Sequence, residues 1–244
     1  VDEPEDGDIL IGNPKLEDET AMGLDIGVEQ TLEDGIFGVN FFYRDVSNVI
    51  EQTSLGASTT GEGDGILQTF ANTGDGTIMG LEFDYSAPLA ENTGLFFNAT
   101  LLDSEITDPF TGEDRTFQNQ AEYVYNVGIT QTHPDMGLSY GFSYQKQGES
   151  KVVEFNREIT LEYDANLELF AEKYFGEQHV LRFTVNNALD AKKTESFDRY
   201  ESGEAETSEA ILENHLNGNI TAHEVEVEQA DPTYSLTYRY NFGQ

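Results

Sequence analysis

The side chains that could bind a metal ion or act in catalysis are four histidines and two groups of carboxylates. The histidines are His133, His179, His215 and His223. No two of them have a spacing that would present both to one metal ion, so we expect solvated loop histidines. The stretch around His215 and His223 also holds four glutamates, Glu213, Glu224, Glu226 and Glu228. A divalent cation bound to this loop is therefore an alternative, although the stretch lacks the ligand spacing of calcium loops.

The second group of carboxylates surrounds a predicted turn at residues 109–112. It consists of Asp103, Glu105, Asp108, Glu113 and Asp114. The group lacks the alternating oxygen spacing of a calcium loop, so a solvated loop is expected. The chain also lacks a nucleophile elbow, a phosphate-binding loop and a dinucleotide fingerprint. We therefore assign no catalytic, cofactor-binding or metal-binding residue and expect that the protein is not an enzyme.

Aromatic side chains on predicted loops are the candidates for ligand contact. They are Phe110, Phe117, Phe197 and Tyr200. Aromatic faces recognise many small ligands in concave sites, so contact with a ligand is one interpretation. Packing within the loops or at a membrane interface is the other interpretation.

Composition excludes several classes of protein. The chain has 47 Asp and Glu against 12 Lys and Arg, a formal charge of -35, which would repel a nucleic-acid backbone. Cysteine is absent, so disulfides and thiolate metal sites are excluded. No apolar run approaches the ~18 residues of a membrane-spanning helix. Strands that cross a membrane hide their apolar residues at every second position, so they remain compatible with this composition.

Alternating apolar and polar residues recur along the whole chain and predict the elements. The last strand is the clearest, with Tyr234, Leu236, Tyr238, Tyr240 and Phe242 on one face. About ten such segments are expected, at residues 22–28, 37–43, 66–71, 78–87, 95–104, 123–129, 138–144, 161–169, 180–185 and 233–242. Short turns and longer loops join them alternately, as in an outer-membrane barrel. The pattern predicts an all-β protein, an antiparallel transmembrane β-barrel over residues 20–244 after a lead-in loop, residues 1–19.

Several local features follow from turn chemistry and periodicity. Asp34-Gly35 predicts a tight hairpin, and residues 72–76 predict a turn between two strands. Residues 161–169 form the cleanest two-faced strand of the sequence, with Leu161, Leu167 and Leu169 on one side. Residues 108–120 and 194–218 are expected to be long polar loops.

Three stretches resemble the C-terminal part of TonB-dependent outer-membrane receptors. The first is Asn13-Pro14-Lys15-Leu16 leading into Gly23–Glu29, with Asp18 where the family usually has proline. The second is Val39–Ile50, followed by Ala71-Asn72-Thr73-Gly74 and Gly80–Phe83. The third is Leu181–Asp190, which is similar to the family's penultimate hairpin, together with a terminal strand that ends in phenylalanine. The resemblance extends from Asn13 to Phe242.

The resemblance implies both an architecture and partners. Family members have a roughly 22-stranded barrel with a plug in its lumen, so this chain would supply about ten C-terminal strands, without the plug and the N-terminal strands. The implied activity is import of a siderophore-bound metal, cobalamin, an oligosaccharide or a peptide through the bacterial outer membrane. The implied partners are outer-membrane lipid, the missing strands and plug, and the inner-membrane TonB complex. The terminal strand would close the barrel.

The sequence is also compatible with two other interpretations. One is a self-closed ten-stranded barrel that acts as a small hydrolase or a porin, for which Asp103, Asp108 or His215 with Glu213 would be the only rim candidates. Pairing of the first strand with the last would distinguish it from a partial receptor. The other is an acidic soluble sandwich, which would make the terminal strand and the stretch near Asn187 coincidences.

Overall fold

The computed structural model describes residues 9–57, 66–109, 111–201 and 208–242. These residues form long strands, one short 3₁₀ turn at Pro134–Met136 and one helix, α1 (Ser208–Leu216). The strands are β1 (Ile9–Ile11), β2 (Thr20–Thr31), β3 (Ile36–Ala57), β4 (Ile66–Ala90), β5 (Thr93–Thr107), β6 (Asp114–Arg115), β7 (Tyr123–His133), β8 (Leu138–Gln147), β9 (Ser150–Val153), β10 (Arg157–Tyr163), β11 (Asn166–Phe175), β12 (His179–Asn186), β13 (Lys192–Arg199), β14 (Ala222–Gln229) and β15 (Thr233–Tyr240).

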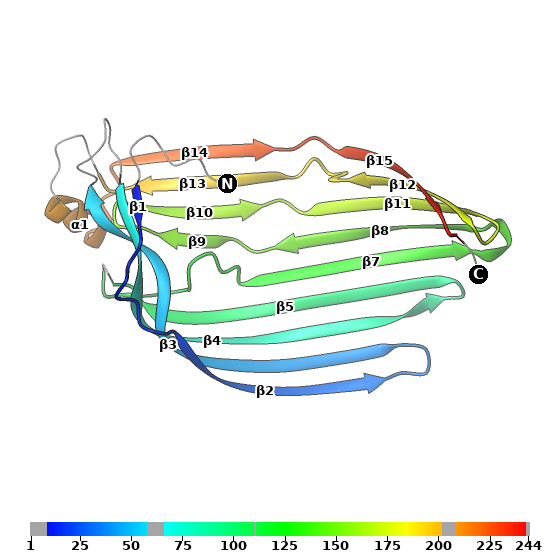
Figure 1. Ribbon diagram of the computed structural model, residues 1–244, viewed down its shortest axis with the longest axis horizontal. Helices are drawn as coiled ribbons and strands as arrows, with labels where there is room; N and C mark the ends of the chain where they lie inside the picture. The colour runs from blue at the N-terminus through cyan, green and yellow to red at the C-terminus, as the bar shows by residue number, and fades with distance from the viewer. Residues whose placement is uncertain (1–8, 58–65, 110, 202–207, 243–244) are drawn as a thin grey trace.

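One continuous wall contains nearly all of these strands. Its main sheet runs in the order β15-β12-β11-β8-β7-β5-β4-β3-β2, and each neighbouring pair is antiparallel. A smaller sheet runs in the order β14-β13-β10-β9. Figure 1 shows α1 and the segment after β5 at one end of the wall, and tight turns with the C-terminus at the other. We call these the loop end and the turn end.

The register places apolar and polar residues on opposite faces, because directly opposed residues of neighbouring strands point the same way. One row of opposed residues is apolar and consists of Ile26, Phe41, Leu81, Leu101 and Tyr123. The next row is mostly polar and consists of Gly27, Asn40, Glu82, Thr100 and Val124. We call the first face the outer face and the second the inner face. The predicted alternation and the all-β antiparallel fold are therefore confirmed.

The terminal strand follows the same rule. Tyr234, Leu236 and Tyr238 lie opposite Val185, Phe183 and Leu181, on the outer face. Phe242 lies beyond the end of β15, is 87% exposed and meets Tyr240 edge-on at 4.6 Å between ring centroids. Whether this strand closes a barrel remains a prediction.

Four neighbouring strands are interrupted at the same level, and this corrects two local expectations. β8, β11, β12 and β15 each stop and continue after a short gap as β9, β10, β13 and β14, in the same lateral order. Residues 161–169 are therefore not one two-faced strand, because the gap at Asp164-Ala165 divides β10 from β11. Leu167 lies opposite Tyr144 on the outer face, whereas Leu161 lines an inner-face cavity with Val124. An extra residue at such a gap reverses the faces of a strand.

The stretch that resembles the family's penultimate hairpin is also such an interruption. Asn187 and Asp190 adopt positive φ angles of 54° and 56°. The Ala191 amide donates to Asn187 Oδ1 at 2.7 Å, and Asn187 Nδ2 donates to the Ala230 carbonyl at 2.6 Å. The chain does not reverse direction here, because β13 continues along β10 and β14 beyond the end of β12.

Three further expectations were wrong in detail. The turn expected at residues 72–76 does not exist, because β4 runs without a break from Ile66 to Ala90. The polar loop expected at residues 194–218 contains most of β13 and the helix α1. The lead-in segment contains β1, which pairs in parallel with β4 at Leu67–Thr69. Residues 1–8 of that segment lie outside the described residues.

The tight hairpin predicted at Asp34-Gly35 is present. β2 and β3 form a tight hairpin around Asp34-Gly35, with Thr31 opposite Ile36. β4 and β5 are joined by a two-residue turn that includes Asn92 at a φ of 61°. Asn adopts this left-handed conformation more readily than most residues do.

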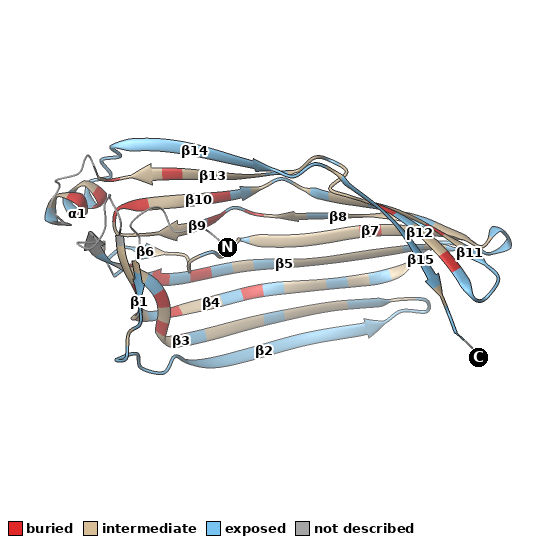
Figure 2. Ribbon diagram, turned by 45° about the horizontal axis from the view of Figure 1, so that its top comes forward, coloured by how far each residue is buried: buried red, intermediate tan, exposed pale blue. Residues whose placement is uncertain are grey.

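The wall is open within the described residues. β2 pairs only with β3, β15 pairs only with β12, and no pair joins β2 to β15. The residues of β2 are exposed throughout, as are those of β14 and nearly all of β15 (Figure 2). The self-closed ten-stranded barrel is therefore wrong for this structure.

No helix in the described part of the chain is both long enough and apolar enough to span a membrane.

Candidate functional site

The segment between β5 and β7 folds against the inner face at the loop end. Its strand β6 pairs with the end of β5, with Arg115 opposite Ile106. Phe117 then packs against a small buried cluster of Val46, Val49 and Ile106. The Phe117 amide donates to Ser104 Oγ at 3.1 Å. The segment between β5 and β7 therefore covers part of the inner face at the loop end.

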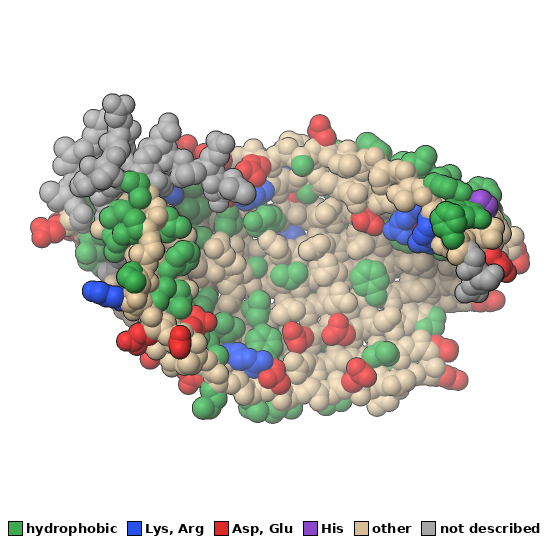
Figure 3. Space-filling view, viewed as in Figure 1, with side chains coloured by type: hydrophobic (Ala, Val, Ile, Leu, Met, Phe, Trp, Pro, Cys, Tyr) green, Lys and Arg blue, Asp and Glu red, His purple; other side chains and the backbone are tan. Residues whose placement is uncertain are grey.

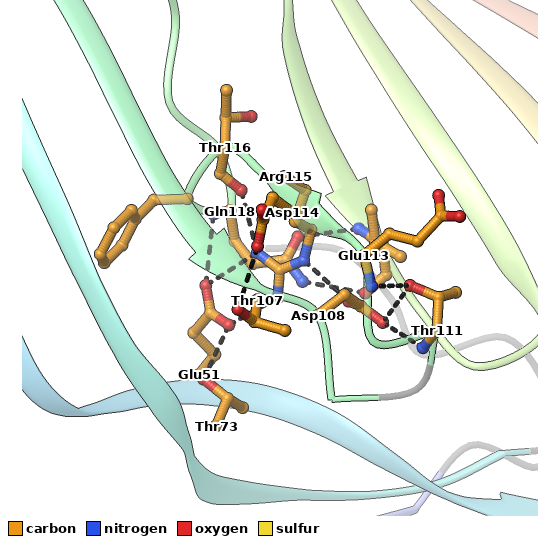
Figure 4. A network of polar contacts seen from close by, with 12 residues as sticks. Glu51, Thr73, Thr107, Asp108, Thr111, Glu113, Asp114, Arg115, Thr116 and Gln118 are labelled. Atoms are coloured by element: carbon orange, nitrogen blue, oxygen red, sulfur yellow. Dashed lines mark hydrogen bonds and ion pairs between the residues drawn. The ribbon is translucent and has the colours of Figure 1, made fainter.

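Arg115 is the centre of a polar network that fixes this segment (Figure 4). Its Nη2 lies 2.7 Å from Glu51 Oε2 on β3, and its Nε lies 2.8 Å from Asp108 Oδ2. Thr73 Oγ1 on β4 donates to Glu51 at 2.9 Å, and the Thr111 amide donates to Asp108 at 2.9 Å. Glu51 and Asp108 are 7% and 3% exposed, so both carboxylates are buried with their partners.

The electrostatics of Arg115 follow from this burial. Loss of solvent acts to lower the pKa of the guanidinium, but the hydrogen bonds to Glu51 and Asp108 outweigh it, and the pKa of Arg115 is raised. A guanidinium that is charged at all relevant pH values therefore balances one of two buried carboxylates.

The loop-end halves of β3 and β4 extend beyond β5 and reach toward the β9–β10 turn. The register of β3 shifts between Val46 and Val49, where Asn48 has a φ of 57°. Beyond this shift, β1 is added to the free side of β4. Gln68 Nε2 on β4 donates to Glu154 Oε1 at 3.4 Å, a contact between residues 86 positions apart.

Two cavities adjoin the segment between β5 and β7. The first, of about 430 Å³, is lined by Leu102, Phe117, Gln118, Asn119, Gln120, Ala121, Val124, Gln147, Ser150, Leu161 and Tyr163. None of these side chains carries a charge at neutral pH. We call it the neutral cavity.

The second cavity, of about 410 Å³, lies nearer to α1. It is lined by Asp108, Thr111, Glu113, Asp114, Arg115, Thr116, Gln120, Glu122, Glu149, Ser150, Lys151, Val153, Glu158, His215 and Leu216. We call it the charged cavity, since it contains six carboxylates against one arginine, one lysine and one histidine.

The helix α1 is attached to the wall through a buried histidine. His215 stacks on Tyr200 with ring centroids 4.1 Å apart, and its Nε2 lies 3.4 Å from Glu158 Oε1. The Tyr200 hydroxyl donates to the same oxygen at 3.1 Å. The hydrogen bond with His215 is the largest cause of the lowered pKa of Glu158; burial opposes it, and the Tyr200 bond adds to it. Burial, followed by the nearby charge of Glu158, raises the pKa of Tyr200.

The predicted ligand-contact residues occupy different places. Phe110 lies outside the described residues. Phe117 lines the neutral cavity and also packs on the buried cluster. Phe197 is 9% exposed, and the guanidinium carbons of Arg157 and Arg199 lie 5.7 Å and 5.9 Å from its ring centroid. Tyr200 is 5% exposed and stacks on His215. Their contact with a ligand remains a prediction, and Phe117 is the one of the three described residues that lines either of the two cavities.

The histidines and acidic groups considered in the sequence are dispersed. His133 and His179 contact Tyr140 and Tyr238 near the turn end. His215 is buried and faces Glu158 rather than Glu213, so the expectation of a solvated loop was wrong for it. Asp108 is held by Arg115. In residues 9–57, 66–109, 111–201 and 208–242, no group of three or more His, Cys, Asp or Glu side chains could hold a metal ion.

Ion pairs also line the inner face away from the cavities. Arg44 Nη2 lies 2.8 Å from Asp25 Oδ1. Arg182 lies over the ring of Phe170, 4.4 Å from its centroid, and within 3.6 Å of carboxylate oxygens of Glu168 and Glu172. The face seen in Figure 3 is hollowed and shows isolated acidic and basic side chains among neutral ones.

Sequence reasoning missed Arg115, Glu51 and the amide side chains of the neutral cavity. Glu51 and Arg115 are 64 positions apart, and neither belongs to a recognisable motif. The one available signal was the rarity of basic residues in an acidic chain, which makes a lone arginine in a carboxylate-rich segment an expected partner for buried acids.

Comparison with known proteins gives a consistent result. A family model described as "TonB dependent receptor-like, beta-barrel" matches residues 3–188. The ferric enterobactin receptor PirA of Pseudomonas aeruginosa is 30% identical over 96 residues, which is 39% of this chain and 13% of that protein.

Solved structures share the fold. The siderophore receptor PirA from Acinetobacter baumannii is 17% identical, with a TM-score of 0.57 over 96% of this chain and 33% of that chain. A variant of the ferric enterobactin receptor PfeA from Pseudomonas aeruginosa, in complex with enterobactin, is 20% identical, with a TM-score of 0.57 over 94% of this chain and 32% of that chain. This chain therefore spans about a third of the length of these solved chains.

Proposed function

This chain belongs to the TonB-dependent receptor family, and we propose that it forms the C-terminal part of the barrel wall of a transporter that binds and imports a scarce nutrient. The family consists of outer-membrane transporters and not of enzymes, so the chain is part of an outer-membrane receptor.

The open wall is the observation that carries this proposal. Its outer face is apolar, its inner face is mostly polar, and both edge strands, β2 and β15, have one side that pairs with no described residue. An unpaired backbone group in lipid costs several kcal/mol, so both edges need neighbouring strands. We propose that the remaining barrel strands supply these neighbours and that a plug occupies the inner face. Outer-membrane lipid would cover the outer face, and the inner-membrane TonB complex would act through the plug.

The loop end is the place where the nutrient would first be bound. In outer-membrane barrels the longer loops face the outside of the cell, and here they surround the neutral and charged cavities. The names of the relatives favour a ferric siderophore among the nutrients that the family imports. Phe117, at the border of the neutral cavity, is the best-placed aromatic contact.

Transport can be tested in cells of the source organism with an iron-55 siderophore uptake assay. We expect that deletion of the receptor abolishes uptake and that collapse of the inner-membrane proton gradient abolishes it equally, because family transport is energised from the inner membrane. Uptake that persists without the gradient would contradict the proposal and would indicate a passive pore.

Barrel closure can be tested separately, because the chain contains no cysteine. A double variant with Gly27→Cys on β2 and Ser235→Cys on β15 should form no intramolecular disulfide in outer membranes, since a disulfide needs Cα atoms within about 7 Å. A Thr100→Cys and Val124→Cys pair is the positive control, because these residues lie directly opposite each other. A Gly27–Ser235 crosslink would show a small closed barrel.

A further inference from the structure

The neutral cavity differs from the rest of this highly acidic chain in its chemistry. Its polar lining consists of the amides of Gln118, Asn119, Gln120 and Gln147 and the hydroxyls of Ser150 and Tyr163. Its apolar lining includes Leu102, Phe117 and Leu161. Amides and hydroxyls can each donate and accept hydrogen bonds without a charge. Such a lining suits a ligand surface that is rich in carbonyl and hydroxyl groups.

Several of these polar groups are available to a ligand. Gln118 is occupied, because its Nε2 donates to the Val153 carbonyl at 2.9 Å and its Oε1 accepts from the Val153 amide at 2.8 Å. The side chains of Gln120, Gln147 and Tyr163 make no hydrogen bond with any described residue. Phe117 supplies an aromatic group beside them. A few convergent polar groups around an apolar floor are typical of small-molecule sites.

Three arginines at the loop end are already bound to carboxylates. Arg115 contacts Glu51 and Asp108. Arg157 Nε lies 2.6 Å from Glu154 Oε2, and Arg199 Nη2 lies 3.2 Å from Glu224 Oε2. To bind one of these arginines, an anionic ligand would have to break its ion pair and would then lie beside the released carboxylate.

The neighbouring charged cavity adds to this barrier. Glu113, Glu122 and Glu149 line it and have no side-chain partner among the described residues, and Lys151 is its one lysine. Like charges close to a binding site lower the affinity for an anion through a field that extends over several ångströms. The electrostatics of the loop end therefore disfavour a ferric catecholate such as ferric enterobactin, which is an anion.

We propose that the neutral cavity binds an uncharged ligand with several carbonyl or hydroxyl groups, and not an anionic chelate. This rests on the proposed function, because it specifies the ligand class of the same loop-end site. An uncharged ferric trihydroxamate and a neutral oligosaccharide both present this chemistry. In either case Gln120, Gln147 and Tyr163 make the hydrogen bonds and Phe117 provides the apolar contact.

The test is binding to the full receptor in detergent by isothermal titration calorimetry with three probes. These are a neutral ferric trihydroxamate, triacetylchitotriose and ferric enterobactin. We expect one of the two neutral probes to bind. The Gln147→Glu substitution should weaken the affinity for that probe by about tenfold or more, because the new carboxylate is desolvated without a partner. The neutral probe that binds identifies the source of the ligand.

Gln145→Glu is the matched control, because Gln145 lies two residues away on the same inner face, opposite Asn126 and Asn166, and does not line the cavity. Tyr163→Phe removes one hydroxyl without adding a charge and should weaken the same probe more modestly. Circular dichroism and thermal unfolding establish that the variants are folded.

Two results would overturn the inference. One is ferric enterobactin binding that Gln147→Glu weakens while neither neutral probe binds. The other is binding of any probe that is equally insensitive to Gln147→Glu and Gln145→Glu. Energy-dependent uptake in cells is measured independently. If uptake persists in the Gln147→Glu strain, the proposed transport function stands and the assignment of the neutral cavity as the ligand site fails.

Discussion

Arg115 Nη2 lies 2.7 Å from Glu51 Oε2 and joins the segment after β5 to the extended half of β3. The same guanidinium holds Asp108 at the start of its own segment. The three side chains are largely buried, so their attraction is little screened by solvent. This pair therefore fixes the segment that carries Phe117 and half of the neutral cavity.

Removal of that guanidinium should loosen the loop end. Arg115→Met removes the guanidinium that bridges the buried carboxylates of Glu51 and Asp108, and loss of one partner of a buried pair costs about 3–5 kcal/mol. We expect faster hydrogen–deuterium exchange in residues 108–120 and a lower unfolding temperature in detergent. Arg44→Met is the control, because its pair with Asp25 is largely exposed, and it should change both readouts little. Equal effects of the two substitutions would contradict the role of Arg115.

Attachment of α1 to the wall should depend on pH in the acidic range, because Glu158 titrates there. Its pKa is lowered in the folded state, so its contribution to stability is present above its unfolded pKa of about 4.3 and is lost as the pH falls through the lower folded value. We expect amide protection of residues 208–216 to fall in that acidic window once intrinsic exchange is corrected. Glu158→Gln should flatten this dependence. The exposed Glu162→Gln on the same strand should leave it unchanged.

Glycine is required where an inner-face phenylalanine lies against the opposite strand. A Cβ at Gly128 would lie 2.2 Å from Cε1 of Phe96 and 2.8 Å from the Phe142 carbonyl oxygen. We expect Gly128→Ala to destabilise the wall by about 1–3 kcal/mol, the usual cost of overpacking. Gly94→Ala on β5 is the control, because nothing lies within 4 Å of its added Cβ. The measurement is urea unfolding in detergent. An unchanged free energy of unfolding in the Gly128→Ala variant would contradict the close contact.

The assignment of the two faces can be tested with neighbouring residues of β5. Leu101 is on the outer face and Thr100 on the inner face. Arginine on the lipid face of an outer-membrane barrel costs about 2–4 kcal/mol near the bilayer midplane and less toward the interfaces. We expect Leu101→Arg to lower stability in lipid vesicles more than Thr100→Arg does. The reverse order would exchange the inner and outer faces.

The sequence predicted the elements whose information is local. The period of two along residues 20–31 and 233–240 is sufficient to separate an apolar from a polar face, and Asp34-Gly35 specifies its own turn. The prediction of one two-faced strand at residues 161–169 failed for a physical reason. An interruption of a strand changes which face its side chains occupy, and Asp164-Ala165 contains no glycine or proline that would mark the interruption in the sequence. The prediction of a turn at residues 72–76 failed in the opposite way: Gly74 and Gly76 suggested an interruption, but the continuous strand β4 accommodates both.

The sequence by itself determined the class of the protein: an antiparallel wall, apolar on one side, of a known receptor family. These properties depend on side-chain alternation and on short motifs, which are readable from neighbouring residues. The tertiary structure alone decided the open edges, the burial of His215, the Arg115 network and the charge-free lining of the neutral cavity. Each depends on contacts between residues dozens of positions apart, whose energies are set by burial and by the partners that the fold brings together.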